Sequence, residues 1–261
     1  MEYKKKLVIG DRSETKEDFV FGTRAVIEAI RAGRSIDKVL IKNGLSNELF
    51  GELYQLIKEY DIPFQYVPLE KINRITRKNH QGILALMASV EFFRIEDVLP
   101  TIFEKGEEPL ILLLDQVTDV RNFGAIVRSA ECAGVHAVVI PEKGAARIGA
   151  DAVKTSAGAL NIVPVCRTPN MGDTIDYLRN SGISVVAATE KASEDYTKVS
   201  MSGPLAIIMG AEDKGISPAM LRAADYLAKI PILGTIGSLN VSVAASLMMY
   251  EAIRQRGLAH E

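Results

Sequence analysis

The sequence predicts a two-domain α/β protein whose larger, C-terminal part is built on a parallel sheet. Three observations support this prediction: apolar runs alternate with helical segments from residue 109 onward, a shorter alternation fills residues 19–91, and a stretch of mixed composition separates them. The chain has 261 residues, of which 48% are hydrophobic and 25% charged. These values are typical of folded globular proteins with one or two domains.

Residues 19–91 alternate short helices with short strands, as expected for a small α/β domain. Helical spacing of Val26, Ala29 and Ile30 predicts a first helix after Gly22. The other expected elements are a strand at 38–41, an amphipathic helix at 47–60, a strand at 63–68 and a last strand at 83–88.

Two further segments lack a periodic apolar pattern. Residues 1–18 carry charges of both signs and predict a flexible arm. Residues 92–108 are acidic and mixed, with Pro100 and Gly106, so we expect a flexible linker between the domains.

The C-terminal part, residues 109–261, repeats strand and then helix. Residues 110–114 form a continuous apolar run, which is typical of a strand buried on both faces of a parallel sheet. This order predicts a doubly wound sheet, in which ligands bind beyond the carboxyl ends of the strands. The expected strands are 110–114, 137–140, 162–165, 183–188, 205–209 and 227–230, with helices at 122–133 and 241–254.

Composition excludes several classes of protein and site. No apolar run is long enough to cross a bilayer, and none of signal-peptide length follows the basic N-terminus, so we expect a cytoplasmic protein. Cys132 and Cys166 have no Cys-x-x-Cys spacing, and the three histidines are scattered, so neither disulfides nor a metal site are expected. The net charge of −2 leaves nucleic-acid contact to a local patch.

Familiar phosphate-binding and hydrolase motifs are missing or incomplete. No Gly-x-Gly-x-x-Gly occurs, which argues against a nicotinamide-dependent oxidoreductase. Gly210 and Gly215 have the glycine spacing of a Walker A loop, but Ile216-Ser217 follows where that loop needs Lys and then Ser or Thr. Neither Gly-x-Ser-x-Gly nor a plausible Cys–His pair is present, so covalent hydrolysis has no nucleophile.

Three loops at expected strand ends carry polar residues and glycines together. Taken singly, each has an ordinary structural explanation, such as a helix cap at Asn122 or a solvated turn. In combination they read Asn-x-Gly-x-x-x-Arg from Asn122, Gly-x-Glu-x-x-Gly from Gly210, and Ser-Leu-Asn-Val-Ser from Ser238. This ordered set resembles the three motifs of the SpoU family of RNA ribose 2′-O-methyltransferases.

The resemblance extends to the N-terminal part, where Phe21-Gly22 and Asn79-His80-Gln81-Gly82 are similar to the family's substrate-binding domain. The whole chain is most similar to bacterial members that methylate a guanosine ribose in 23S ribosomal RNA. The family resemblance implies a SPOUT-type parallel sheet with a deep trefoil knot, expected here at about 205–243. It also implies a homodimer, with the helix at 241–254 contributing Val243, Leu247 and Tyr250.

The resemblance further implies S-adenosylmethionine as the methyl donor and a catalytic role for Arg128. Because arginine is not deprotonated in proteins, we expect Arg128 to bind a phosphate and stabilise the developing oxyanion rather than act as a base. No metal is required. The expected helpers of Arg128 are Asn122, Glu212, Ser238 and Asn240, and the expected cofactor contacts are Thr189, Gly210, Ile230 and Leu239.

A basic segment in the N-terminal domain is the expected RNA contact. Residues 71–78 contain four fixed positive charges and no acid. Transfer RNA is the alternative substrate, and a non-catalytic RNA-binding assembly factor is the alternative function. The intact polar residues of all three motifs argue against the latter. The candidate RNA-binding residues are Arg24, Lys71, Arg74, Arg77 and Lys78.

Overall fold

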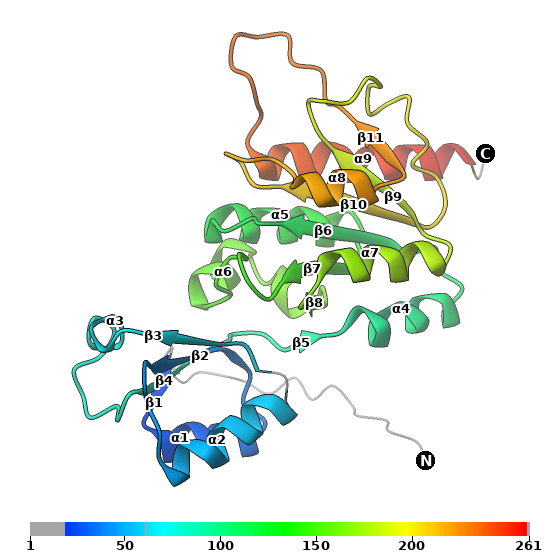
Figure 1. Ribbon diagram of the computed structural model, residues 1–261. Coiled ribbons are helices and arrows are strands. Elements are labelled where there is room, and N and C mark those ends of the chain that lie inside the picture. Colours follow the sequence, from blue (N-terminus) through cyan, green and yellow to red (C-terminus); the bar gives the residue numbers. More distant parts are fainter. Residues whose placement is uncertain (1–18, 61, 260–261) are drawn as a thin grey trace.

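The computed structural model describes residues 19–60 and 62–259, so the predicted arm at 1–18 lies outside the described residues. The smaller N-terminal part lies below the larger part in the view of Figure 1. Its elements are β1 (Phe19–Phe21), α1 (Thr23–Arg31), β2 (Ile36–Lys42), α2 (Glu48–Glu59), β3 (Phe64–Val67), α3 (Leu69–Asn73) and β4 (Ile83–Met87).

The larger part follows without a break. Its elements are β5 (Phe92–Phe93), α4 (Ile95–Glu104), β6 (Leu110–Asp115), α5 (Val120–Cys132), β7 (Ala137–Pro141), α6 (Ala150–Thr155), a 3₁₀ turn (Ala159–Asn161), β8 (Val165–Thr168), α7 (Met171–Asn180), β9 (Ser184–Ala188), β10 (Leu205–Gly210), α8 (Pro218–Ala223), β11 (Tyr226–Ala228) and α9 (Val241–Ala259).

The smaller sheet has the strand order β1-β4-β2-β3, with β3 at an edge. Helices α1 and α2 bury one apolar face against β2 and β4, and α3 covers the other face. Helix α2 begins where its sequence dictates: the side chain of Asn47 accepts a hydrogen bond from the Phe50 N–H at 2.8 Å. Such a cap satisfies a donor that the first turn otherwise leaves unpaired.

The larger sheet is parallel throughout, in the order β11-β9-β10-β6-β7-β8-β5. Every residue of β6 and β10 is buried, which explains their continuous apolar sequences. Helices α5 and α9 cover one face, and α4, α7 and α8 cover the other. The doubly wound parallel sheet predicted from the sequence is therefore confirmed.

The segment at 92–108 is not the irregular linker that its composition suggested. β5 pairs in parallel with β8, so this segment supplies an edge strand of the larger sheet. In α4, Ile95, Leu99 and Ile102 are each at most 3% exposed and pack on the sheet. Burial of each such side chain contributes about 1.5–3 kcal/mol, which holds the segment in place. The expectation of a flexible linker was wrong, because acidic residues on the outer face of α4 masked its apolar stripe.

Other expected bounds differ in detail. The strand expected at 162–165 begins only at Val165, because the 3₁₀ turn and a bend occupy the residues before it. Part of the basic segment at 71–78 is helical, since α3 continues to Asn73. The closing helix extends beyond residue 254, to Ala259.

A buried ion pair joins the two parts of the chain. The Arg167 guanidinium donates to Asp37 Oδ1 at 2.6 Å and to the Asp37 carbonyl oxygen at 3.0 Å. It also lies 3.5 Å above the centre of the Phe92 ring. The Ser89 N–H adds a bond to the Ile148 carbonyl at 3.1 Å. These contacts fix the smaller domain against the larger one.

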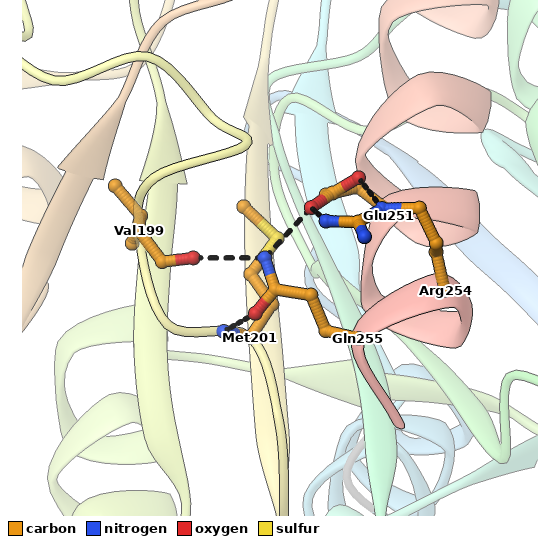
Figure 2. Close-up of polar contacts among 5 residues, drawn as sticks. All are labelled: Val199, Met201, Glu251, Arg254 and Gln255. Carbon is orange, nitrogen blue, oxygen red and sulfur yellow. Dashed lines mark hydrogen bonds and ion pairs between the residues drawn. The ribbon is translucent and has the colours of Figure 1, made fainter. Parts of the chain in front are cut away.

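Figure 2 shows how α9 holds the loop that precedes β10. Gln255 accepts from the Met201 N–H at 2.7 Å and donates to the Val199 carbonyl at 3.0 Å. Its amide also donates to Glu251 at 2.7 Å. The same loop contacts the chain after β11, where the Lys229 N–H donates to the Glu194 carbonyl at 3.0 Å. These bonds join the loop before β10 to α9 and to Lys229. The trefoil knot expected at about 205–243 stays a prediction.

Candidate functional site

The three motif loops meet at the carboxyl edge of the larger sheet, after β6, β10 and β11. The chain leaving β6 turns to the α5 face, whereas the chain leaving β10 turns to the α8 face. Adjacent strands that send their connections to opposite faces open a crevice between the loops, where ligands bind in such sheets.

A chain of side-chain hydrogen bonds links one residue from each motif. Asn240 Nδ2 donates to Asn122 Oδ1 at 3.0 Å, and Asn122 Nδ2 donates to Glu212 Oε2 at 3.0 Å. The Ser242 N–H donates to Asn240 Oδ1 at 2.9 Å, which orients the Asn240 amide. The three loops are therefore one polar cluster in space.

Asn122 does not cap α5, as the sequence suggested. Asp119 is the cap, because its Oδ1 accepts from the Asn122 N–H at 2.7 Å. Asn122 lies in the first helical turn, and this leaves both ends of its amide free for Glu212 and Asn240. The spacing of an acid three residues before Asn122 could have revealed the true cap.

A cavity of about 390 Å³ opens beside this cluster. All four residues expected to contact the cofactor line it, and so do Glu212 and Ser238. Thr189 is buried, whereas Leu239 is partly exposed at the rim. The lining comprises Ala188, Thr189, Glu190, Met209, Gly210, Ala211, Glu212, Asp213, Lys214, Gly215, Ile230, Ile232, Gly237, Ser238, Leu239, Val241 and Ala244.

Two motif glycines are required by close packing. A Cβ on Gly210 would lie 2.2 Å from the carbonyl carbon of Gly215, because the loop folds back in a tight turn there. A Cβ on Gly124 would lie 2.7 Å from Cβ of Thr155, where α5 crosses α6. Neither position accepts a larger residue without displacing its neighbours.

A second cavity, of about 440 Å³, adjoins the first on the other side of Glu212. Gln116, Thr118 and Asn122 line it, and Glu212 borders both cavities. Asp115, at the end of β6, was not predicted from the sequence as a site residue. It is only 6% exposed. Asp115 Oδ2 accepts from the Ser217 N–H at 2.7 Å and so joins the end of β6 to the start of α8. An acid directly after an apolar strand was the available signal.

Arg128 is not brought to this cluster within one chain. It is exposed on α5, six residues beyond Asn122, so it lies about 9 Å further along the helix and roughly 120° around it. It lines neither cavity.

The predicted RNA-binding residues lie in the smaller domain. Arg24 is exposed at the start of α1, and the four basic residues of 71–78 are exposed on α3 and the segment after it. The buried His80 anchors this segment: its Nε2 pairs with Asn73 Oδ1 at 2.9 Å, and its Nδ1 accepts from the Gly82 N–H at 3.0 Å.

The buried Cys166 does not support covalent chemistry. Burial, with Glu96 and Asp97 nearby, raises the pKa of Cys166 to about 12, so its thiolate is not available near neutral pH. Among the described residues, no three His, Cys, Asp or Glu side chains are grouped to hold a metal ion. No helix in residues 19–60 and 62–259 is long and apolar enough to cross a membrane.

Comparison with known sequences gives matches to both domains. Residues 109–250 match the family described as SpoU rRNA Methylase, and residues 19–93 match the RNA 2′-O ribose methyltransferase substrate-binding family. A Bacillus subtilis protein bearing the name TrmH family tRNA/rRNA methyltransferase YacO is 35% identical, over 92% of this chain and 97% of that protein. A Staphylococcus haemolyticus protein of the same family name is 36% identical over the same shares.

Solved structures with the same fold include the SpoU methyltransferase AviRb of Streptomyces viridochromogenes, with a TM-score of 0.59 and 26% identity over 92% of this chain and 90% of that one. An AdoMet-bound rRNA methyltransferase of Sinorhizobium meliloti has a TM-score of 0.58 and 26% identity, over 90% of this chain and 86% of that one. With both domains matched and the three motif loops assembled around one cavity, the chain belongs to the SpoU family of RNA methyltransferases.

Proposed function

We propose that this enzyme transfers a methyl group from S-adenosylmethionine to the ribose 2′-hydroxyl of a guanosine in 23S ribosomal RNA. The observation that carries the proposal is the Asn122–Glu212–Asn240 cluster, which lies at the wall between two cavities. One cavity then serves the methyl donor and the other the acceptor nucleotide. A cytoplasmic location is part of the proposal, because its RNA substrates are there.

The first cavity suits S-adenosylmethionine. Its volume lies within the range of about 300–1,000 Å³ that small-molecule sites occupy. Apolar side chains such as Met209 and Val241 provide surfaces for an adenine, and the Gly210 loop presents backbone groups. The lining has three carboxylates, on Glu190, Glu212 and Asp213, and one cation, on Lys214, so its charge complements a sulfonium.

When bound, S-adenosylmethionine supplies an electrophilic methyl group, and the protein must align the ribose oxygen with it. Asn122, Glu212 and Asn240 would hold the ribose by hydrogen bonds, with Ser238 at the cavity wall. Thr189, Gly210, Ile230 and Leu239 would hold the cofactor. Arg128 would bind the adjacent phosphate and stabilise the oxyanion, and a phosphate oxygen or water would accept the proton.

We further propose that the enzyme is a homodimer in which Arg128 of one copy serves the cavity of the other. Val243, Leu247 and Tyr250 form an exposed stripe on α9, at the spacing of one helix face. In the neighbouring loop, Leu233 is 99% exposed and Ile236 is 78% exposed. We take these exposed apolar side chains as one protein interface, and a second copy of this chain is the proposed partner.

Methyl transfer from labelled S-adenosylmethionine to 23S ribosomal RNA and to transfer RNA tests the activity. We expect label at a ribose 2′-oxygen of the ribosomal RNA, and a loss of about 100-fold in Arg128→Ala. Arg128→Lys should be similarly impaired, because lysine cannot make a bidentate contact with phosphate. Full activity of Arg128→Lys would contradict the guanidinium role. Label found only in transfer RNA would show that transfer RNA, and not ribosomal RNA, is the substrate. No label in either RNA would favour an assembly factor.

Mixing two inactive variants tests the shared site. In a dimer of Arg128→Ala with Asn122→Ala, sharing leaves one cavity with both residues intact. Random exchange should then restore about a quarter of the wild-type rate, because half of the dimers have one working site of two. No recovery would show that Arg128 acts within its own chain.

A further inference from the structure

A groove of about 740 Å³ runs between the two domains, away from the cofactor cavity. The smaller domain contributes Lys38 from β2, Lys58 from α2 and the edge strand β3. The larger domain contributes the turn after β7, which includes Lys143 and Gly144. The groove is therefore a surface that neither domain has alone.

The groove combines positive charge with an aromatic face. Three lysines and one carboxylate, Glu142, are among its lining residues. Phe64 and Tyr66 meet edge to face at 5.8 Å between ring centres, and the Lys58 ammonium lies 5.2 Å from the Phe64 ring centre. Tyr66 remains 48% exposed, so one aromatic ring is available to a ligand.

Two contacts relate the groove to the basic segment and to the second cavity. Lys71 Nζ lies 3.5 Å from Oε1 of Gln65, which is a lining residue of the groove. A Cβ on Gly144, another lining residue, would lie 3.9 Å from Cγ of Gln116, and Gln116 lines the second cavity beside Asn122. α3 lies at the left of Figure 1, on the side of the exposed loop between β11 and α9.

The walls of the groove are held at a fixed separation. The buried Arg167–Asp37 pair and the Ser89–Ile148 hydrogen bond cross between the same two domains. An RNA strand bound in the groove would therefore span a fixed distance between the smaller domain and the methyl donor.

We propose that this groove binds a single-stranded segment of the substrate RNA and guides it from the basic segment to the second cavity. Lys38, Lys58 and Lys143 contact phosphates, and one base stacks on Tyr66. Single-stranded nucleic acid is bound in this manner, by a positive channel with aromatic platforms. The inference rests on the proposed function for its purpose and adds a binding surface to it.

Fluorescence anisotropy with a labelled single-stranded RNA of about 12 nucleotides tests the groove directly. In Lys143→Ala, the slope of log K against log salt should fall by about 0.7, and affinity should fall several-fold. Tyr66→Ala should weaken binding roughly tenfold or more, whereas Tyr66→Phe keeps the stacking face and should bind as wild type does. Lys105→Ala, at the exposed end of α4, is the matched control.

The outcomes separate this inference from the proposed function. Weaker RNA binding in Lys143→Ala and Tyr66→Ala, with unchanged melting temperature and S-adenosylmethionine affinity, supports the groove even if the wild type methylates neither RNA. If both variants bind the RNA as tightly as the wild type does, the inference is overturned. The groove would then be free for another occupant, such as a peptide strand that pairs with the edge of β3. An equal loss in Lys105→Ala also overturns it, because the effect would then be general charge.

Discussion

At the scale of the residue, Gly210 shows most directly how the site is built. The methyl group of Ala at this position would overlap the Gly215–Ile216 peptide, at 2.2–2.3 Å. The loop must therefore move, and this loop lines the first cavity, the proposed cofactor site. We predict that Gly210→Ala lowers the affinity for S-adenosylmethionine by about tenfold or more, as overpacking costs of about 1–3 kcal/mol would give. Isothermal titration calorimetry measures this change.

The matched control is Gly149→Ala, which adds the same methyl group where no atom lies within 4 Å. It should bind the cofactor as wild type does. If Gly210→Ala also bound normally, the loop would have to be more adaptable than its packing indicates.

The candidate site could be predicted from the sequence in part. The loops that meet were identified, because residues at the carboxyl ends of neighbouring parallel strands converge. The partner of each side chain was not, since Asn122 bonds Glu212 and Asn240 only through a register set by the sheet. Arg128 was grouped with them by motif, but helix geometry turns it away from its own cavity.

At the scale of the element, the half-buried amide of Gln255 ties α9 to the rest of the larger domain. Gln255 bonds the loop before β10 at Val199 and Met201, and its NH₂ group also faces Glu251. Gln255→Glu replaces that donor with a carboxylate opposite another carboxylate. We predict a loss of roughly 2–4 kcal/mol in the free energy of unfolding at neutral pH. Urea denaturation measures it, with the exposed Asn161→Asp as control.

The pH dependence of this variant gives a second criterion. A hydrogen bond from Arg254 holds the pKa of Glu251 below its ordinary value of 4.5. In the wild type, the ionised Glu251 carboxylate therefore contributes fully to the free energy of unfolding above pH 4.5. This contribution is lost as the pH falls through the lowered pKa. In Gln255→Glu, protonation of the added carboxylate relieves repulsion, so the deficit should shrink from pH 7 to about pH 5. A deficit independent of pH would contradict this explanation.

Elements with strong local signals were predictable from the sequence, and those defined by distant partners were not. Unbroken apolar runs predict β6 and β10. β5 has only two residues and exists because β8 pairs with it, which no local pattern encodes. The order of the strands is likewise a property of the folded sheet.

At the scale of the whole molecule, the Arg167–Asp37 pair determines whether the two domains move as one. Both side chains are about one-tenth exposed, so Arg167→Ala would leave a buried carboxylate unpaired, at a cost of about 3–5 kcal/mol. We predict that the variant unfolds in two calorimetric transitions and has a larger radius of gyration by X-ray scattering. Arg179→Ala breaks a more exposed pair with Asp225 inside the larger domain and should leave the scattering unchanged. A single transition and unaltered scattering in Arg167→Ala would show that other contacts suffice.

The assembly of the site from three separated loops also sets the order of events during synthesis. The smaller domain is complete at about residue 93, whereas the third loop reaches Asn240. At translation rates of about 5–20 residues per second, the gap is on the order of ten seconds. On the proposed RNA-binding role of residues 71–78, a nascent chain would hold RNA during that time without having a cofactor cavity. Stalled or truncated chains would thus occupy the substrate without modifying it, and act as inhibitors of the finished enzyme.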